Sequence, residues 1–239
     1  MAKRKNKPIS ILFIGNSFSY YHGLPKLVAD LVRASGSGDL VVDGVFQGSA
    51  TLKMLWDDGK ALKKLRSKSW DYVILQERGR LGGVMKRGIV HVGKPQVFFT
   101  YATRFYKEAK KIGATTILYC PPSFLGTNSL HDVKKLHTAY AALARKLNVR
   151  MISPRAAFTL ALGKRPRLNL YERDRQHPNP LGMYLIACLF YKKLFQKRIT
   201  HLPLRLYSSR SAKIPKNPKS VKLSRTDAQF LWSIANRTK

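Results

Sequence analysis

Apolar runs along the chain alternate with segments whose apolar residues recur at helical spacing. Five runs predict strands, at 8–14, 40–46, 70–76, 115–120 and 150–152. Five segments predict helices, at 24–34, 52–65, 95–112, 131–147 and 180–195. Strands that are apolar on both faces and separated by helices favour a mostly parallel sheet between two helical layers. We therefore predict an α/β fold, a three-layer α/β/α sandwich with a five-stranded, doubly wound sheet.

The carboxyl ends of the predicted strands are the expected place for a functional site. In a flavodoxin-like, doubly wound sheet, ligands bind at that edge. Ser17 follows the first predicted strand, Gly48 the second and Gln76 the third. Periodicity alone thus brings these three residues to one edge of the sheet.

Two segments do not fit the predicted core. Residues 77–94 hold five glycines and five basic residues, which is too long for a simple connection and predicts a substrate-covering loop. Residues 202–223 are rich in Pro, Ser and Lys and predict an extended arm. Ser224 then has the character of an N-cap for a short helix to about residue 236. We expect residues 1–200 to form the main domain, and the basic arm of residues 201–239 to pack its helix on it.

The composition fits one domain and changes the picture mainly through charge. The 239 residues carry 45 Lys and Arg against 12 Asp and Glu, a net charge of +33. From Arg175 to the end there are 14 basic residues and one acid, Asp227. Such a field attracts nucleic acid, acidic polysaccharide or anionic lipid. The alternative is a solvated basic surface without a dedicated partner.

The sequence does not indicate a metal site, a disulfide or a membrane-spanning segment. Cys120 and Cys188 lie in apolar surroundings and are expected in the core. No metal-ligand spacing occurs, and no cofactor is predicted. The basic N-terminus precedes an apolar run that is short and interrupted by Ser10, which favours a first strand over a signal peptide. With no transmembrane segment in view, we expect a soluble, cytoplasmic protein.

Three residues offer the chemistry of nucleophilic catalysis. Ser17 follows Gly15 and Asn16 in a tight strand-to-helix turn. A serine hydroxyl needs a base that takes its proton and donors aimed at the oxyanion. His177 is the best base, and Asp174, three residues earlier, can hold its second ring nitrogen.

Other polar residues near these motifs have competing interpretations. Ser19 is an alternative nucleophile that is better placed to cap or pack in the first helical turn. Asn179 can hold the turn after His177 or cap the last core helix. Several residues can touch substrate or be structural: Asn16 as an Asx-turn residue, Glu77 as an ion-pair partner, and Arg78, His22 and His91 as surface residues.

Residues 15–18, Gly-Asn-Ser-Phe, resemble the first block of the SGNH (GDSL-type) hydrolases, and residues 174–177, Asp-Arg-Gln-His, match their last block. The resemblance covers about residues 8 to 196. It implies that Ser17 is the nucleophile, His177 the base and Asp174 its partner. It also implies an oxyanion hole from the N–H groups of Ser17 and Gly48. The family's third block normally supplies an Asn side chain to the oxyanion hole. This chain has Gln76 there, which carries the same amide donor on one more methylene and is expected in the oxyanion hole, unless it only caps the end of the strand.

Two functions remain open from the sequence. The first is hydrolysis of a small O-acyl ester, such as an acetyl ester, on a carbohydrate or other anionic carrier, through an acyl-enzyme. The second is a weakly catalytic or non-catalytic protein that binds an acidic polymer through its basic surface. Nucleic acid is a poor candidate because only Tyr207 and Trp232 interleave with the basic residues of the arm.

Overall fold

The computed structural model describes residues 7–87, 89–122, 130–214 and 220–238. The basic residues 1–6 lie outside the described residues, as do Gly88 of the predicted substrate-covering loop and residues 215–219 of the predicted arm, with Pro215 and Pro218.

The centre of the fold is a five-stranded sheet in the order β2-β1-β3-β6-β7, in which every neighbouring pair is parallel. Its strands are β1 (Ile9–Gly15), β2 (Leu40–Phe46), β3 (Tyr72–Leu75), β6 (Thr115–Tyr119) and β7 (Arg150–Ile152). The chain leaves β1 toward β2 on one side and returns to β3 on the other side. This reversal confirms the predicted flavodoxin-like order and opens a crevice at the carboxyl ends of β1 and β3.

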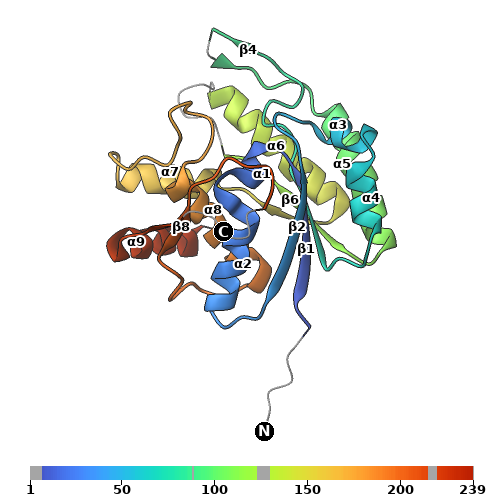
Figure 1. Cartoon of the computed structure of the whole chain (residues 1–239). Helices are drawn as coiled ribbons and strands as arrows, with labels where there is room; N and C mark the ends of the chain where they lie inside the picture. Colours follow the sequence, from blue (N-terminus) through green and yellow to red (C-terminus); the bar gives the residue numbers. More distant parts are fainter. Residues whose placement is uncertain (1–6, 88, 123–129, 215–219, 239) are drawn as a thin grey trace.

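Helices cover both faces of the sheet, as predicted (Figure 1). One face carries α2 (Leu24–Ala34), α7 (Arg155–Lys164), α8 (Pro180–Phe195) and α9 (Arg225–Arg237). The other carries α3 (Leu52–Asp57), α4 (Lys60–Arg66), α5 (Gln96–Lys111) and α6 (Leu130–Leu147). The side chains of β1 alternate between the two faces and so contribute to both hydrophobic cores. Ile11 and Phe13 face the first helical layer, while Leu12 and Ile14 face the second.

Several elements differ from the sequence prediction. The predicted helix 52–65 is two helices, α3 and α4, because Gly59 adopts a left-handed backbone (φ 75°) that ends the first. Helix α7 was not predicted. The predicted loop 77–94 contains a small hairpin of β4 (Met85–Lys86) and β5 (Ile89–Val90). The predicted arm contains a second hairpin of β8 (Arg205–Tyr207) and β9 (Ser220–Lys222).

The C-terminal helix α9 is fixed against α8. Ser224 caps α9 through its hydroxyl, which accepts from the Asp227 N–H, as the sequence indicated. Trp232 donates from Nε1 to the Tyr184 hydroxyl at 2.9 Å. The Lys192 ammonium reaches three main-chain carbonyl oxygens near the end of α9, those of Ala235, Asn236 and Thr238. The arm is therefore joined to the main domain by both apolar and polar contacts.

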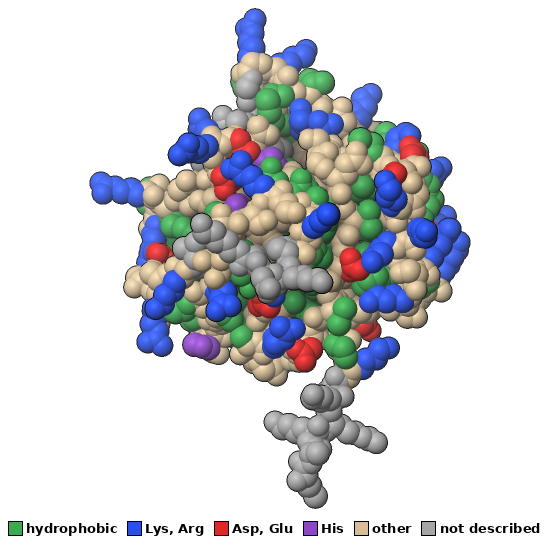
Figure 2. Space-filling model, in the orientation of Figure 1, with side chains coloured by type: hydrophobic (Ala, Val, Ile, Leu, Met, Phe, Trp, Pro, Cys, Tyr) green, Lys and Arg blue, Asp and Glu red, His purple; other side chains and the backbone are tan. Residues whose placement is uncertain are grey.

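The surface is basic without a single dominant patch on the face shown in Figure 2. Lys and Arg side chains are spread across that face among a few acidic side chains. Both cysteines are free and buried, as expected for core residues. Within the described ranges, no helix has the length and apolar character needed to cross a bilayer.

Candidate active site

The turn that presents Ser17 is fixed by side-chain hydrogen bonds. Strand β1 ends at Gly15, and the short helix α1 (Ser17–Tyr20) begins directly after Asn16. The Asn16 side chain accepts from the Phe18 N–H at 3.2 Å and donates to the Ala50 carbonyl at 2.9 Å. A Cβ on Gly15 would lie 2.6 Å from the Ser19 Oγ, so only glycine fits there. The turn therefore holds Ser17 at the carboxyl edge of the sheet.

Ser17, His177 and Asp174 form one hydrogen-bonded chain. The Ser17 Oγ lies 2.7 Å from the His177 Nε2, and the His177 Nδ1 lies 2.6 Å from the Asp174 Oδ2. Partial burial opposes ionisation of Asp174, but N–H groups of His177 and Gln176 and the His177 ring together lower its pKa. Because the ionised carboxylate accepts the Nδ1–H, Nε2 is left free to accept the serine proton.

The His177 ring is also held by aromatic stacking. Phe18 stacks on it at a centroid distance of 4.8 Å, and Tyr21 does so at 4.6 Å. Both rings come from the segment that begins with Ser17: Phe18 lies in α1, and Tyr21 begins the 3-10 turn η1 (Tyr21–Gly23). The same short segment thus carries Ser17 and holds the His177 ring beside it.

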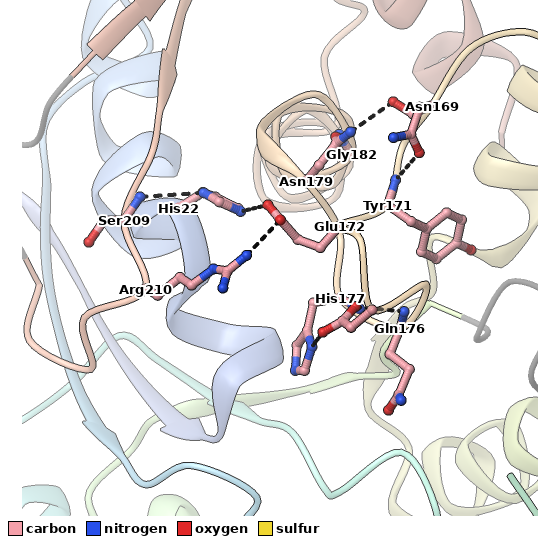
Figure 3. Close-up of polar contacts among 11 residues, drawn as sticks. His22, Asn169, Tyr171, Glu172, Gln176, His177, Asn179, Gly182, Ser209 and Arg210 are labelled. Atoms are coloured by element: carbon pink, nitrogen blue, oxygen red, sulfur yellow. Dashed lines mark hydrogen bonds and ion pairs between the residues drawn. The ribbon is translucent and has the colours of Figure 1, made fainter. Parts of the chain in front are cut away.

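The loop that carries Asp174 and His177 is pinned to the start of α8. The Glu172 N–H donates to the His177 carbonyl at 2.8 Å, which closes the loop on itself. Asn179 caps α8 by accepting from the Gly182 N–H at 3.0 Å, and its amide donates to the Asn169 carbonyl (Figure 3). Asn179 therefore fills both roles considered from the sequence.

A cluster of polar contacts around the buried His22 links this loop to the C-terminal arm. Figure 3 shows Glu172 between His22 and Arg210, with contacts of 2.9 Å and 2.7 Å. The His22 N–H donates to the Ser209 carbonyl at 2.5 Å. His22 is 3% exposed, and burial lowers its pKa despite the Glu172 carboxylate. The prediction that His22 touches substrate is not supported, because its ring faces this cluster.

Gln76 is turned away from the position that the resemblance implied. Its Oε1 accepts from the Asn16 N–H and from the Ser19 hydroxyl, each at 2.9 Å, and its Nε2 donates to the Glu77 carbonyl. The side chain is fully buried. The structure therefore contradicts the prediction that its amide faces an oxyanion. The longer Gln76 side chain folds back and stabilises the turn that carries Ser17. The Ser19 hydroxyl takes part in the same hydrogen bonds.

Glu77 was considered as an ion-pair partner or a substrate contact, and the structure places it in neither role. It is 2% exposed, and its carboxylate accepts from the Leu52 N–H at 2.9 Å and the Arg78 N–H at 2.7 Å. Among the described residues it forms no ion pair. Burial raises its pKa to about 7, against its backbone partners and the Arg78 charge. Glu77 instead ties the end of β3 to the start of α3.

A small cavity adjoins Ser17 and His177. Its volume is about 40 Å³, counted as the space that the centre of a water molecule can occupy. Its lining residues are Asn16, Ser17, Phe18, Ser49, Arg78, Gly79, Arg80, Gln176 and His177.

Some of these lining residues were predicted to contact substrate and others were not. Asn16 and Arg78 were predicted, although Asn16 uses its amide inside the protein. Sequence reasoning missed Ser49, Arg80 and Gln176, which are neighbours of residues it had chosen. Gly48 itself does not line the cavity, but its turn does, through Ser49. His91 is half-exposed, and its nearest carboxylate is Asp132, at 3.8 Å.

Comparison with solved structures finds chains of the same fold. The lipase/acylhydrolase from Enterococcus faecalis superposes with a TM-score of 0.64 at 16% identity, covering 81% of this chain and 100% of that chain. The acetyl xylan esterase AlAXEase gives 0.61 at 18% identity, covering 78% and 100%. The psychrotrophic esterase EstA from Pseudoalteromonas sp. gives 0.57 at 18% identity, covering 79% and 99%.

Comparison of the sequence with protein-family models and with curated proteins finds no match. At identities this low, the structural likeness concerns the fold. The chain has the α/β fold of these lipase and esterase structures.

Proposed function

We propose that this protein is a serine ester hydrolase of the SGNH (GDSL) type. Ser17 is the nucleophile, His177 the general base and Asp174 the group that orients it. The observation that carries the proposal is the 2.7 Å contact between the Ser17 Oγ and the His177 Nε2. The other ring nitrogen of His177 contacts the Asp174 carboxylate. The fold shared with esterases and lipases supports the same activity.

The reaction proceeds by two acyl transfers. The Ser17 Oγ attacks the ester carbonyl while His177 takes its proton. The tetrahedral intermediate then collapses, and His177 gives that proton to the leaving alkoxide. This leaves the acyl group on Ser17. Water, activated by His177, attacks the acyl-enzyme, which releases the carboxylic acid and restores the hydroxyl.

Backbone groups supply the proposed oxyanion hole. The N–H groups of Ser17 and Gly48 donate to no other atom of the described residues. Both belong to turns at the carboxyl edge of the sheet, and the turn of Gly48 reaches the cavity through Ser49. Gln76 contributes indirectly, because it holds the Asn16–Ser17 turn through the Asn16 N–H.

The cavity favours a short acyl group. One water molecule needs roughly 10–15 Å³ on this measure. The 40 Å³ near Ser17 therefore accommodates about three water-sized groups, close to an acetyl group. We propose an O-acetyl ester as substrate, with a carbohydrate as carrier, since a neighbour of the same fold is an acetyl xylan esterase.

The test combines turnover with covalent labelling. The wild-type protein should hydrolyse p-nitrophenyl acetate faster than longer acyl esters and should react with a fluorophosphonate probe. Ser17→Ala should abolish both signals. Ser19→Ala is the matched control, because it removes a neighbouring hydroxyl and should still label. The proposal fails if the wild-type protein neither hydrolyses nor labels, or if Ser17→Ala leaves turnover unchanged.

The alternative of a non-catalytic polyanion-binding protein is not favoured. The Ser17, His177 and Asp174 side chains are assembled at hydrogen-bonding distances. The Lys and Arg side chains on the face of Figure 2 are scattered, whereas a polymer-binding groove requires a continuous track.

A further inference from the structure

Two arginines stand beside the catalytic serine and histidine without a counter-ion. Arg78 and Arg80 flank Gly79, and all three line the cavity with Ser17 and His177. Both arginines are partly buried. Arginine ion pairs in the described part of the chain involve Arg33, Arg66, Arg165 and Arg210, and neither of these two.

The carboxylates of the catalytic loop and of the adjacent Glu77 are already engaged. Asp174 binds the His177 ring, and Glu172 binds His22 and Arg210. Glu77 accepts from two backbone N–H groups, and its raised pKa reduces its charge near neutral pH. Burial and the positive charge of Arg78 lower the pKa of Arg80. Neither arginine forms an ion pair within the described part of the protein.

Two other partly buried arginines of this protein, Arg150 and Arg165, have partners. Arg165 pairs with Asp227 at 2.9 Å and lies over the Phe230 ring at 3.9 Å. Arg150 donates to the Lys193 carbonyl at 2.8 Å. Desolvated charges are costly unless they are paired. Within the described ranges, neither Arg78 nor Arg80 has an ion pair of the kind that Arg165 makes.

The backbone beneath the two arginines is held in place. The Arg80 carbonyl accepts from two glycine N–H groups, those of Gly83 at 2.7 Å and Gly93 at 2.8 Å. A Cβ on Gly83 would meet backbone at 1.9 Å, so the two ends of the loop pack as closely as glycine allows. The loop thus presents its arginines on a fixed frame.

The same loop is anchored to the catalytic segment. Val90 is fully buried and packs against Phe18, the residue after the nucleophile. The Val92 N–H donates to the Asp132 carboxylate at 2.8 Å, and the Lys135 ammonium donates to the Val92 carbonyl at 2.7 Å. These contacts fix the arginines relative to Ser17.

We propose that Arg78 and Arg80 form an oxoanion subsite, which binds a carboxylate or phosphate carried by the substrate close to the scissile ester. A planar guanidinium binds such groups through two parallel hydrogen bonds, and a pair of guanidinium groups surrounds one anion. The inference rests on the proposed esterase activity. It narrows the substrate class to esters with an acidic group beside the acylated oxygen or on the acyl chain.

The experiment compares matched substrates on the full-length protein. Three anionic esters are tested: 3-acetoxybenzoate, 3-acetoxyphenyl phosphate and 4-nitrophenyl hydrogen succinate. Their neutral partners are methyl 3-acetoxybenzoate, 3-acetoxyanisole and 4-nitrophenyl butyrate. The first two pairs place the anion on the alcohol part, and the third places it on the acyl part. The quantity measured is the ratio of kcat/KM, anionic over neutral.

A hydrogen bond to a charged group contributes enough for a ratio of about ten- to hundredfold in at least one pair. Arg78→Gln with Arg80→Gln should reduce that ratio to near one, because the anionic esters should lose far more kcat/KM than the neutral ones. Lysine at both positions should retain part of the preference, because the charge remains. Arg87→Gln is the matched control, since this exposed arginine of the same loop does not line the cavity, and it should keep the wild-type ratio.

Two results would overturn the subsite and leave the esterase intact. One is Ser17-dependent hydrolysis of neutral esters with no anionic preference in any pair. The other is an equal loss on anionic and neutral esters in the double glutamine variant, which would indicate a merely structural role. If no ester of either kind is hydrolysed, the proposed function fails and the subsite fails with it.

Discussion

The buried carboxyl of Glu77 should make the stability of this protein fall as the pH rises. Its pKa is raised from 4.5 to about 7 by burial. The unfolded chain therefore releases this proton near pH 4.5, whereas the folded protein keeps it until about pH 7. Between these two pH values, the free energy of unfolding therefore decreases as the pH rises. The stabilisation is complete below pH 4.5 and lost once the pH exceeds 7.

The magnitude follows from the pKa difference. One pKa unit corresponds to about 1.4 kcal/mol, so the full shift is worth about 3 kcal/mol, of which about 2.5 kcal/mol falls between pH 5 and pH 8. For a chain of this size that is roughly 5–10 °C in Tm. His22 acts in the opposite sense, because its lowered pKa costs stability as the pH falls below its ordinary value of 6.5. The wild-type curve alone therefore does not isolate Glu77.

The assay is urea unfolding of wild type and Glu77→Gln at pH 5 and pH 8. The difference between the two proteins should change by about 2.5 kcal/mol over this interval in favour of the variant. Gln loses one of the two hydrogen bonds from Leu52 and Arg78, so its absolute stability is not the measure. Asp58→Asn, at an exposed carboxyl, should leave the wild-type slope unchanged. Parallel curves for wild type and Glu77→Gln would refute the reasoning.

Three further results are expected. Gly182→Ala should lower the free energy of unfolding by about 1–3 kcal/mol in urea titration, because its Cβ would lie 2.2 Å from the Leu170 carbonyl; an unchanged midpoint would contradict this. Glu172→Gln should lower kcat on p-nitrophenyl acetate more than it raises KM, since it loosens the contacts to His22 and Arg210 behind the catalytic loop; a change in KM alone would argue against that role. Both cysteines should resist iodoacetamide in the native protein and react after unfolding, because burial raises their thiol pKa; native labelling would show that one is accessible.

The sequence predicted the layers of the fold because its periodicities are strong. The inner strands β1, β3 and β6 are mainly apolar and buried, and α2 and α8 coincide with the predicted ranges 24–34 and 180–195. The break in the predicted helix 52–65 occurs at Gly59, which adopts a left-handed backbone. The apolar residues keep helical spacing across this glycine, so their pattern did not predict the break. The β8–β9 hairpin depends on a pairing between segments more than ten residues apart, which local patterns do not specify.

The site could be predicted only where spacing determines position. Asp174 and His177 lie in one short loop, and Ser17 directly follows the turn after β1, so their approach follows from the topology. The orientation of Gln76 does not, because one added methylene lets its amide turn to the nucleophile turn instead of the cavity. The burial of Glu77 does not follow from the topology either, since an acidic residue close to two arginines in the sequence is equally compatible with an exposed ion pair.

The packing of α9 on α8 has a consequence for the order in which the chain acquires its structure during synthesis. Helix α8 follows the catalytic loop directly and is buried along residues 182–191, yet part of its cover arrives only with Trp232 and its neighbours. A nascent chain that has reached α8 therefore exposes an apolar surface that no earlier segment can bury.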